Sequence, residues 1–421
     1  MRVILSFTNR KNEIEALEKA ALAGGLVVVF GRRRVGKTRL LTEWLGRVGG
    51  FYSQAIEASA GIQLEQVARD VAGALPENIT AKNWLEFFEL LSLRKERTVL
   101  CLDEFPYLAA SDPSLPSVIQ RWLDHRKPEG FTLILSGSST SAMNDCFLNR
   151  SAPLYQRARA ILAVRPMDYT AFCEACGLPR GEIESFTRFS LVGGIPKYWE
   201  FAVGGGTALN LAEELFFGNP GYLEDEPARI LRDERVGGIV PLSVLEAVGR
   251  GAAKTSEIAA RLGTAQTNLG RVLQQLLDAS LLNREIPYGE SLRTTKRIHY
   301  RIADPSIRFW FRVFSPNRTA WGRLSKAEKN KLLRDHAAGI FEDWCREAHL
   351  GAARLWDAAA EFDSIRSSGG GVVVTEVKFK TLSEAEKEGL SQSLSTRWAR
   401  SAFSKKYAMA AFEVVDASAL S

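Results

Sequence analysis

The sequence predicts an α/β protein built on a parallel sheet that helices cover on both faces. Three short runs, at residues 26–30, 98–102 and 131–135, are almost uniformly apolar. Strands that are buried on both faces have this composition. Helical patterns at 84–93 and 117–125 separate the runs, and strands that alternate with helices form parallel sheets.

Length and composition favour several ordered domains. At about 150 residues per domain, a chain of 421 residues predicts two or three domains. The hydrophobic share of 46% and the charged share of 25% exclude disordered, collagen-like and disulfide-scaffold proteins. A net charge of +6 is compatible with a polyanionic partner and does not require one.

The cysteines and the lengths of the apolar runs indicate the cellular compartment of the protein. Five cysteines without regular spacing indicate a reducing environment, where thiols pack as small hydrophobic groups. The apolar runs at 1–10 and 20–30 are too short for a signal peptide or a membrane span. We therefore expect a cytoplasmic protein without a membrane partner.

We expect four structural units along the chain. An amphipathic helix at 13–22 precedes the first apolar run, and the strand signal fades near residue 166 into helices with glycine breaks, which predict a helical lid. Three short helices and two strands, at 282–287 and 297–303, then outline a winged helix-turn-helix. The last stretch has its own helix, at 333–349, and its own hairpin. The expected boundaries are 1–166, 167–236, 237–315 and 316–421.

Residues 31–38, with the sequence GRRRVGKT, match the phosphate-binding pattern GxxxxGK[ST]. The match lies after a predicted strand and before a predicted helix, which is the context that makes the pattern specific. Gly31 and Gly36 let backbone amides turn toward phosphate oxygens, Lys37 reaches the β- and γ-phosphates, and Thr38 offers its hydroxyl to magnesium. The pattern predicts a site for ATP and Mg²⁺.

Polar residues follow the second and third apolar runs. Asp103 and Glu104 come after the second, and we expect Asp103 to hold the magnesium shell and Glu104 to orient the attacking water. Two acids that merely end a strand are the alternative. Ser138, after the third run, is placed to touch a γ-phosphate if this strand lies beside the others, and an ordinary turn is the alternative. Arg157 is a candidate transition-state cation, in this chain or on a neighbouring copy, with a plain surface arginine as the alternative.

A family resemblance rests on these residues together with FTNR at 7–10 and GGIP at 193–196. The set resembles the archaeal-type ATPases, AAA-related P-loop proteins of the signal-transducing STAND group. The resemblance covers the whole chain and implies that both segments flank the nucleotide base, so that the lid senses the bound nucleotide. Asn9 departs from the family pattern, where glycine is common. The expected nucleotide-binding residues are Asn9, Arg10, Gly31, Arg34, Val35, Gly36, Lys37, Thr38, Arg39 and Pro196.

The helix-turn-helix pattern predicts a surface for DNA. Residues 255–263 contain a helix and a glycine turn, 266–278 would be the recognition helix, and the wing at 284–301 concentrates basic charge. A regulatory arm that packs on the ATPase core and binds no DNA is the alternative, and the residues leave both open. The candidate DNA-binding residues are Gln266, Asn268, Arg271, Arg293, Lys296 and Arg297.

The tail contains acids in a pattern typical of magnesium-dependent nucleases. A helix carries Glu342, a strand with Asp363 follows, and after a turn at 367–371 the returning strand carries Glu376 and Lys378. Residues two apart on a strand share a face, so both point toward Asp363 across the hairpin. Three carboxylates and a lysine suit a magnesium ion that activates water against a phosphodiester. The pattern resembles the D...ExK core of the PD-(D/E)XK nucleases, and an exposed hairpin with ordinary acids is the alternative.

The predicted fold class is therefore α/β: a P-loop NTPase parallel sheet with a helical lid, a winged helix-turn-helix and a C-terminal α/β domain similar to restriction endonucleases. The predicted function is a magnesium-dependent ATPase and nucleotide switch, coupled to DNA binding and, through the tail, to DNA cleavage. The alternative is an ATP-gated DNA-binding regulator or interaction protein whose tail no longer cuts. The partners considered are ATP, DNA and a signalling or regulatory protein, and an oligomer is compatible with either function.

Overall fold

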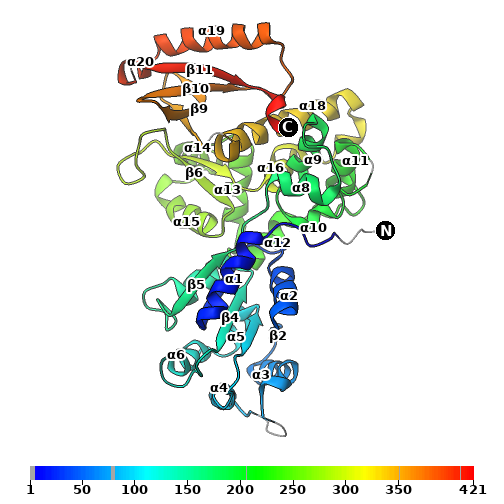
Figure 1. The fold of residues 1–421 in the computed structure, drawn as a ribbon. Coiled ribbons are helices and arrows are strands. Elements are labelled where there is room, and N and C mark those ends of the chain that lie inside the picture. Colours follow the sequence, from blue (N-terminus) through cyan, green and yellow to red (C-terminus); the bar gives the residue numbers. More distant parts are fainter. Residues whose placement is uncertain (1–4, 77–80, 205, 350, 408) are drawn as a thin grey trace.

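The computed structural model describes residues 5–76, 81–204, 206–349, 351–407 and 409–421. The described chain contains three sheets and four clusters of buried hydrophobic side chains. Figure 1 shows the N-terminal sheet at one end of the molecule and the C-terminal sheet at the other, with mainly helical segments between them.

The N-terminal sheet is parallel throughout, with the strand order β2-β3-β4-β1-β5. The strands expected at 26–30, 98–102 and 131–135 are confirmed as β1, β3 and β4, which are apolar because both of their faces are buried. The short β2 and the edge strand β5 lack such a run and were not predicted. The bounds are β1 (Gly25–Phe30), β2 (Phe51–Gln54), β3 (Val99–Asp103), β4 (Thr132–Gly137) and β5 (Ala158–Ala163).

Helices cover both faces of this sheet, as the alternation of elements predicts. On one face α1 and α2 pack against Val27 and Val29 of β1, and on the other α3, α4 and α6 share a cluster with Leu26 and Val28. Successive side chains of a strand point to opposite faces, which explains the division. The bounds are α1 (Lys11–Ala23), α2 (Lys37–Val48), α3 (Ala60–Asp70), η1 (Ala72–Ala74), α4 (Trp84–Leu91), α5 (Phe105–Ser111), α6 (Leu115–His125) and α7 (Thr140–Phe147).

Short helices follow β5, as expected for the lid, and join the hydrophobic cluster of α1 and α2. The long helix α18 (Lys326–Trp344) packs on them, with the ring of Phe341 5.4 Å from that of Phe186. α18 therefore shares the hydrophobic cluster of the lid, whereas the tail sheet has a cluster of its own. The domain limits stay a prediction. The lid bounds are α8 (Tyr169–Cys176), α9 (Ile183–Val192), α10 (Pro196–Trp199), α11 (Ala208–Ala212), η2 (Glu213–Phe217) and α12 (Glu226–Asp233).

The next unit has three helices and then an antiparallel hairpin, in the expected order, around its own cluster of buried side chains. The expected recognition helix at 266–278 begins with a 3-10 turn, and α15 lies against α7 of the N-terminal sheet. The bounds are α13 (Ile239–Gly249), α14 (Thr255–Leu262), η3 (Gln266–Leu269), α15 (Gly270–Asp278), β6 (Leu282–Glu285) and β7 (His299–Ile302). Short helices lead on to α18: α16 (Pro305–Phe309), η4 (Trp310–Phe314), α17 (Ser315–Asn317) and η5 (Trp321–Arg323).

The tail sheet has the order β11-β10-β9-β8, in which β10 and β11 are parallel and the other pairs antiparallel. Ser368 pairs with Gly371, so the hairpin turn is shorter than the expected 367–371. None of the helices in the described ranges is both long and apolar enough to cross a membrane. The remaining bounds are η6 (Cys345–His349), β8 (Ala353–Trp356), β9 (Glu361–Ser368), β10 (Gly371–Val377), α19 (Glu384–Arg400), α20 (Phe403–Lys406), β11 (Ala410–Val415) and η7 (Ala417–Leu420).

Candidate nucleotide site

The phosphate loop joins β1 to α2, which is the strand, loop and helix order that the motif requires. Gly36 has a φ of 98°, a left-handed conformation that favours glycine. A Cβ on Gly31 would lie 2.2 Å from the carbonyl oxygen of Val164, so no larger residue fits. The loop leads into the N-terminus of α2, where unpaired backbone N–H groups and the helix dipole favour an anion.

Lys37 is the first residue of α2, and its side chain is buried. Nζ donates to the carbonyl oxygen of Gly31 at 2.8 Å and to Ser138 Oγ at 2.9 Å. Burial lowers the pKa of Lys37, against the opposing charges of Glu104 and Asp103. A buried cation whose hydrogen-bond partners are neutral is well suited to receive a phosphate.

Asp103 ends β3 and is fully buried. Its Oδ2 accepts hydrogen bonds from the hydroxyl of Thr38 at 2.7 Å and from that of Tyr52 at 2.9 Å. Burial and then the charge of Asp103 raise the pKa of Tyr52. Tyr52 lies on β2, one of the two strands that the sequence did not predict. No sequence motif therefore marked Tyr52 as a residue of the site.

Glu104 follows Asp103 with a φ of 55°, in the left-handed region that non-glycine residues rarely adopt. Its carboxylate accepts hydrogen bonds from the hydroxyl of Ser138 and from the Ser138 backbone N–H, the latter at 3.2 Å. The strand before Ser138, β4, pairs with β1 and β3. Ser138 therefore lies beside the strand ends that carry the phosphate loop and Glu104, as its expected role requires. The structure therefore brings Lys37, Glu104 and Ser138 into one hydrogen-bonded group.

The three loop arginines, Arg32, Arg33 and Arg34, all bind acids outside the loop. Their Nη1 atoms lie 2.8 Å from Asp304 Oδ2, 2.7 Å from Asp233 Oδ2 and 2.6 Å from Glu226 Oε2, respectively. Asp233 and Glu226 belong to α12 of the lid, whereas Asp304 precedes α16. Arg34, which we expected to contact the nucleotide, instead has its charge paired with the lid, although it still lines the cavity described next.

A cavity of about 730 Å³ lies over the phosphate loop. Lys37, Thr38 and Glu104 form one part of its wall. Residues of the segments 7–10 and 193–196 also line it. A pocket of this size accommodates a small-molecule ligand. Its other lining residues include Phe7, Thr8, Arg10, Arg39, Ser138, Met167, Pro196 and Arg235.

Asn9 does not belong to this cavity wall. It is exposed, and its Oδ1 accepts a hydrogen bond from the backbone N–H of Arg10 at 2.9 Å. Arg10 is buried and donates through Nη2 to the carbonyl oxygen of Val35 at 2.9 Å. Arg10 therefore contacts the phosphate loop through its hydrogen bond to Val35. Arg39 donates to the carbonyl oxygen of Leu5 at 2.6 Å.

The GGIP turn joins the lid to the site. Gly194 accepts a hydrogen bond from the backbone N–H of Met167 at 2.9 Å, and a Cβ on Gly194 would lie 2.1 Å from the Met167 carbonyl oxygen. Trp199 Nε1 donates to the carbonyl oxygen of Gly193 at 2.7 Å. These contacts position Pro196, the first residue of α10, at the cavity wall.

Arg157 lies outside the cavity. Its Nη2 is 2.9 Å from Asp124 Oδ2, and Nη1 donates to the carbonyl oxygen of Pro153 at 3.0 Å. Arg157 is therefore not part of the site within its own chain, and a role on a neighbouring copy stays a prediction. Arg235, just after α12, lines the cavity instead, and its guanidinium has no hydrogen bond or ion pair among the described residues.

Glu234 connects the end of the lid to the strand end that carries Ser138. It is buried, and its Oε2 accepts a long hydrogen bond of 3.4 Å from the hydroxyl of Ser139. Burial raises the pKa of Glu234 to about 7, against the lowering effect of the Ser141 backbone N–H. Neither Glu234 nor Arg235 belongs to a local motif, so only the folded chain identifies them.

The remaining predicted residues lie far from this cavity. All six candidate DNA-binding residues are exposed, and Arg297 is paired with Glu290. In the tail, Lys378 Nζ lies 2.7 Å from Glu376 Oε1, and Asp363 accepts a hydrogen bond from the Val377 backbone N–H at 3.1 Å. Over the described ranges, no group of three or more Asp, Glu, His or Cys side chains is arranged to hold a metal ion. The tail metal site with Glu342 therefore stays a prediction.

Comparison with known proteins identifies the N-terminal part of the chain. Residues 7–200 match the family model of an ATPase domain that comes predominantly from Archaea. The chain is therefore similar to that family over just under half of its length. The matched segment includes the phosphate loop, Asp103, Glu104 and the turn before Pro196.

Similar proteins match stretches of different length in this chain. An uncharacterized protein of Methanocaldococcus jannaschii is 26% identical over 413 residues, covering 90% of this chain and 89% of that protein. An uncharacterized ATP-binding protein of the same organism is 46% identical over 44 residues, or 10% of this chain and 75% of that protein. A solved Walker-type ATPase of Pyrococcus abyssi is 20% identical with a TM-score of 0.54, over 73% of this chain and 96% of that one. This last similarity shows a shared fold.

Proposed function

We propose that the protein is a magnesium-dependent ATPase that acts as a nucleotide switch and passes its state to a DNA-binding unit. The observation that carries the proposal is the convergence in one cavity of Lys37, the Thr38 hydroxyl beside Asp103, and Glu104 with Ser138. These groups meet the needs of phosphoryl transfer, which depends mainly on positioning and on stabilising charge.

Each group has a separate role in this proposal. Lys37 offsets the charge of the β- and γ-phosphates, and Glu104 orients the water that adds to the γ-phosphorus as the bond to the bridging oxygen breaks. Arg235, whose guanidinium lines the cavity, is suited to stabilise the charge that develops on the phosphate oxygens.

Thr38 and Asp103 fit a magnesium ion. Their side-chain oxygens lie 2.7 Å apart, and Mg²⁺ prefers oxygen ligands, with carboxylates and substrate phosphates among them. When bound, Mg²⁺ would neutralise part of the phosphate charge. The buried Asp103 would then exchange its hydroxyl partners for a stronger charge interaction.

The loop arginines support the coupling. Arg32 and Asp304 form an ion pair whose side chains are 8% and 2% exposed, and Asp304 also accepts a hydrogen bond from the backbone N–H of Ile307 at 3.0 Å. Asp304 lies two residues after the end of β7 of the hairpin and directly before α16. Breaking such a buried pair is costly, so a shift of the phosphate loop on nucleotide binding would move the start of α16 with it.

The overall proposal is tested by measuring ATP turnover with and without DNA and examining the DNA on the same gel. We expect phosphate release that requires Mg²⁺ and changes when DNA is added. Absence of both ATP binding and turnover would refute the ATPase assignment. Retention of intact DNA would favour the regulator over the nuclease, and magnesium-dependent nicking would favour the nuclease.

The exposed wing supports DNA binding through Arg293 and Lys296, whose side chains have no ion pair among the described residues. Substituting both with alanine should weaken DNA binding and make the slope of log affinity against log salt less negative by about 0.9 per lost phosphate contact. Fluorescence anisotropy with duplex DNA at several salt concentrations measures this slope. Arg297→Ala should have a smaller effect because Glu290 already neutralises that guanidinium.

The control for the wing variants is Arg121→Ala, which removes an exposed arginine of α6 in the ATPase domain. It should leave the salt slope unchanged. Wild-type protein that does not bind DNA, or binds it without dependence on salt, would leave the regulatory arm as the better explanation of this unit.

DNA cleavage by the tail is the second candidate function, and one electrostatic observation favours it. Burial and then the charge of Glu376 raise the pKa of Asp363, while burial and then Asp363 raise that of Glu342. Asp363 thus repels both Glu342 and Glu376, although, despite burial, hydrogen bonds from Lys378 and Arg397 lower the pKa of Glu376. A cation among the three acids would relieve the repulsion, with Lys378 beside the phosphate.

Asp363→Asn tests this tail site. We expect Mg²⁺ or Mn²⁺ to raise the melting temperature of the wild-type protein by binding the folded state, and the substitution to erase that increase. It should also abolish nuclease activity and leave ATP turnover intact. Glu388→Gln, at an exposed position on α19, is the matched control. Melting that is independent of metal, with no DNA cut in any nucleotide state, would make the tail an interaction module.

A further inference from the structure

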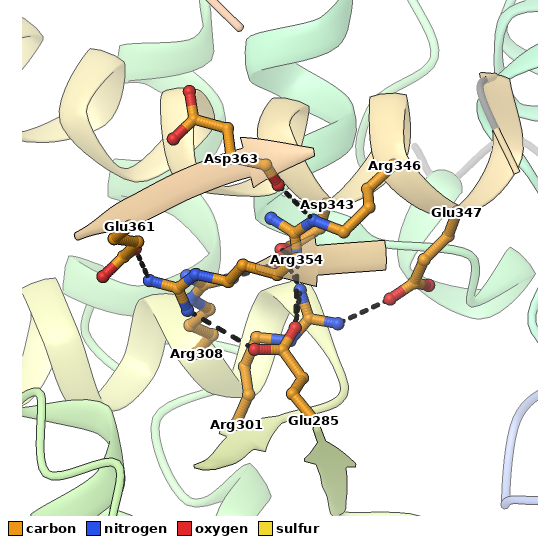
Figure 2. A network of polar contacts seen from close by, with 9 residues as sticks. All are labelled: Glu285, Arg301, Arg308, Asp343, Arg346, Glu347, Arg354, Glu361 and Asp363. Carbon is orange, nitrogen blue, oxygen red and sulfur yellow. Dashed lines mark hydrogen bonds and ion pairs between the residues drawn. The ribbon is translucent and has the colours of Figure 1, made fainter. Parts of the chain in front are cut away.

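The hairpin, α18 and the tail sheet meet in a dense network of arginines and acids (Figure 2). Glu285 of β6 pairs with Arg346 at 3.0 Å and with Arg354 at 3.4 Å. Asp343 of α18 pairs with Arg308, at 2.5 Å, and with Arg301 of β7. The network connects three segments that are distant in sequence.

Beside this network is a cavity of about 520 Å³, which we call the arginine cavity. In the part of the chain that the structure describes, its charged lining consists of five arginines and one acid, Glu285. Asp343 lies behind the wall and is shared by Arg301 and Arg308. The lining arginines are Arg250, Arg301, Arg308, Arg312 and Arg354.

Several donors of this wall lack partners. Both ring nitrogens of His299 are buried without a hydrogen bond, and so is Nε of Arg301. The His299 ring is held in place by stacking on Trp356, with centroids 4.5 Å apart. Arg312 is exposed and has no hydrogen bond or ion pair among the described residues. Burial lowers the pKa of His299, which favours the neutral ring with a single N–H donor. Buried polar groups ordinarily have partners, so this N–H and Arg301 Nε indicate a missing acceptor.

Some arginines of the cavity wall are paired with acids outside it: Arg250 with Glu246 at 2.8 Å, and Arg354 with Glu361. Burial, and then the charges of Arg301 and Arg312, lower the pKa of Arg308 to about 9, although Glu342 and Glu285 oppose them. Arg312 has no acidic partner among the described residues, so its charge beside Arg308 stays unpaired. A bound anion would supply the missing charge.

We propose that the arginine cavity binds a small molecule carrying one or more phosphate groups, at a site separate from the phosphate loop. Arginine forks match phosphate oxygens in geometry, and the excess of lining cations suits an anion with more than one charge. The volume is in the range of small-molecule sites. Apolar lining from Val248, Ala252 and Ile302 leaves room for the uncharged part of such a ligand.

The ligand would bind where the hairpin meets the tail. Arg301 comes from β7, Arg354 from β8 and Arg250 from the end of α13. Phosphate contacts from these three elements would hold the hairpin and the tail sheet together. The site is therefore placed to control the position of the tail relative to the unit proposed to bind DNA.

Pyrophosphate is the probe, titrated calorimetrically into the full-length protein. The test variants are Arg250→Gln with Arg312→Gln, both on exposed side chains, and His299→Phe, which keeps a ring against Trp356 and removes both nitrogens. Each should weaken one pyrophosphate site by about tenfold or more, as expected for lost hydrogen bonds to a charged group, and leave ATP binding unchanged. Arg121→Gln should bind pyrophosphate as the wild type does.

Lys37→Ala separates this site from the phosphate loop. A pyrophosphate site that persists in Lys37→Ala and is lost in the arginine double variant supports the proposal. Loss of all pyrophosphate binding in Lys37→Ala would overturn it, as would titrations of the double variant and His299→Phe that match the wild type. Weaker binding of duplex DNA by the double variant, with pyrophosphate binding unchanged, would assign the cavity to a nucleic-acid surface and also overturn the proposal.

Discussion

Lys37→Ala is expected to reduce ATP affinity at least about a hundredfold, because the variant loses charge-assisted hydrogen bonds worth about 1.5–3 kcal/mol each. Lys37 is the buried cation at the end of the glycine turn, and its Nζ is already held by the Gly31 carbonyl oxygen and Ser138. The loop arginines will not replace it, because their guanidinium groups are paired with Asp304, Asp233 and Glu226. Calorimetric titration with ATP measures the change.

The control for Lys37→Ala is Lys331→Ala, at an exposed position of α18. It should bind ATP as the wild type does. A melting curve of Lys37→Ala distinguishes loss of the site from loss of the fold. If the folded variant bound ATP with unchanged affinity, the assignment of the phosphate loop would be wrong.

Glu104→Gln is expected to lower ATP turnover by about 10²–10⁴, the usual contribution of a group that assists proton transfer, while ATP stays bound. Glutamine preserves the size of the side chain and removes the negative charge. The backbone conformation of Glu104 aims its carboxylate at Ser138, on the neighbouring strand end. Steady-state phosphate release and a separate binding titration measure the two quantities.

Glu89→Gln, on the exposed face of α4, is the matched control and should turn over ATP normally. Equal losses of binding and turnover in Glu104→Gln would mean that Glu104 is structural, or that Asp103 and Glu104 have exchanged roles. Asp103→Asn distinguishes these outcomes because it should weaken the dependence on magnesium.

Local sequence patterns predicted the strands β1, β3 and β4 and the loop between β1 and α2 correctly. Their signals are contained in a few neighbouring residues: apolar side chains for strands buried on both faces, and glycine where the backbone takes a left-handed turn. β2 and β5 were missed because a four-residue strand and a half-exposed edge strand carry no comparable run.

The structure places Asn9 and Arg157 outside the cavity of their own chain for a different reason. A resemblance or a charge suggests which residue can contact a nucleotide, but the direction of a side chain depends on its partners in the fold. Asn9 caps its own turn, and Arg157 is captured by Asp124 from α6. Tyr52, Glu234 and Arg235 were missed because each reaches the site from an element with no motif.

The sequence by itself determined the central strands of the parallel sheet, the phosphate loop and the two acids at the end of β3, because these depend on neighbouring residues and on burial. Only the tertiary structure decided the partners of the loop arginines, the packing of α18 on the lid and the arginine cavity. Those features join residues that are far apart in the sequence, 272 positions in the pair of Arg32 with Asp304, and no local pattern encodes such a contact. Burial strengthens each charge interaction. Arginine pairs that would add little stability on the surface therefore hold the structural units together.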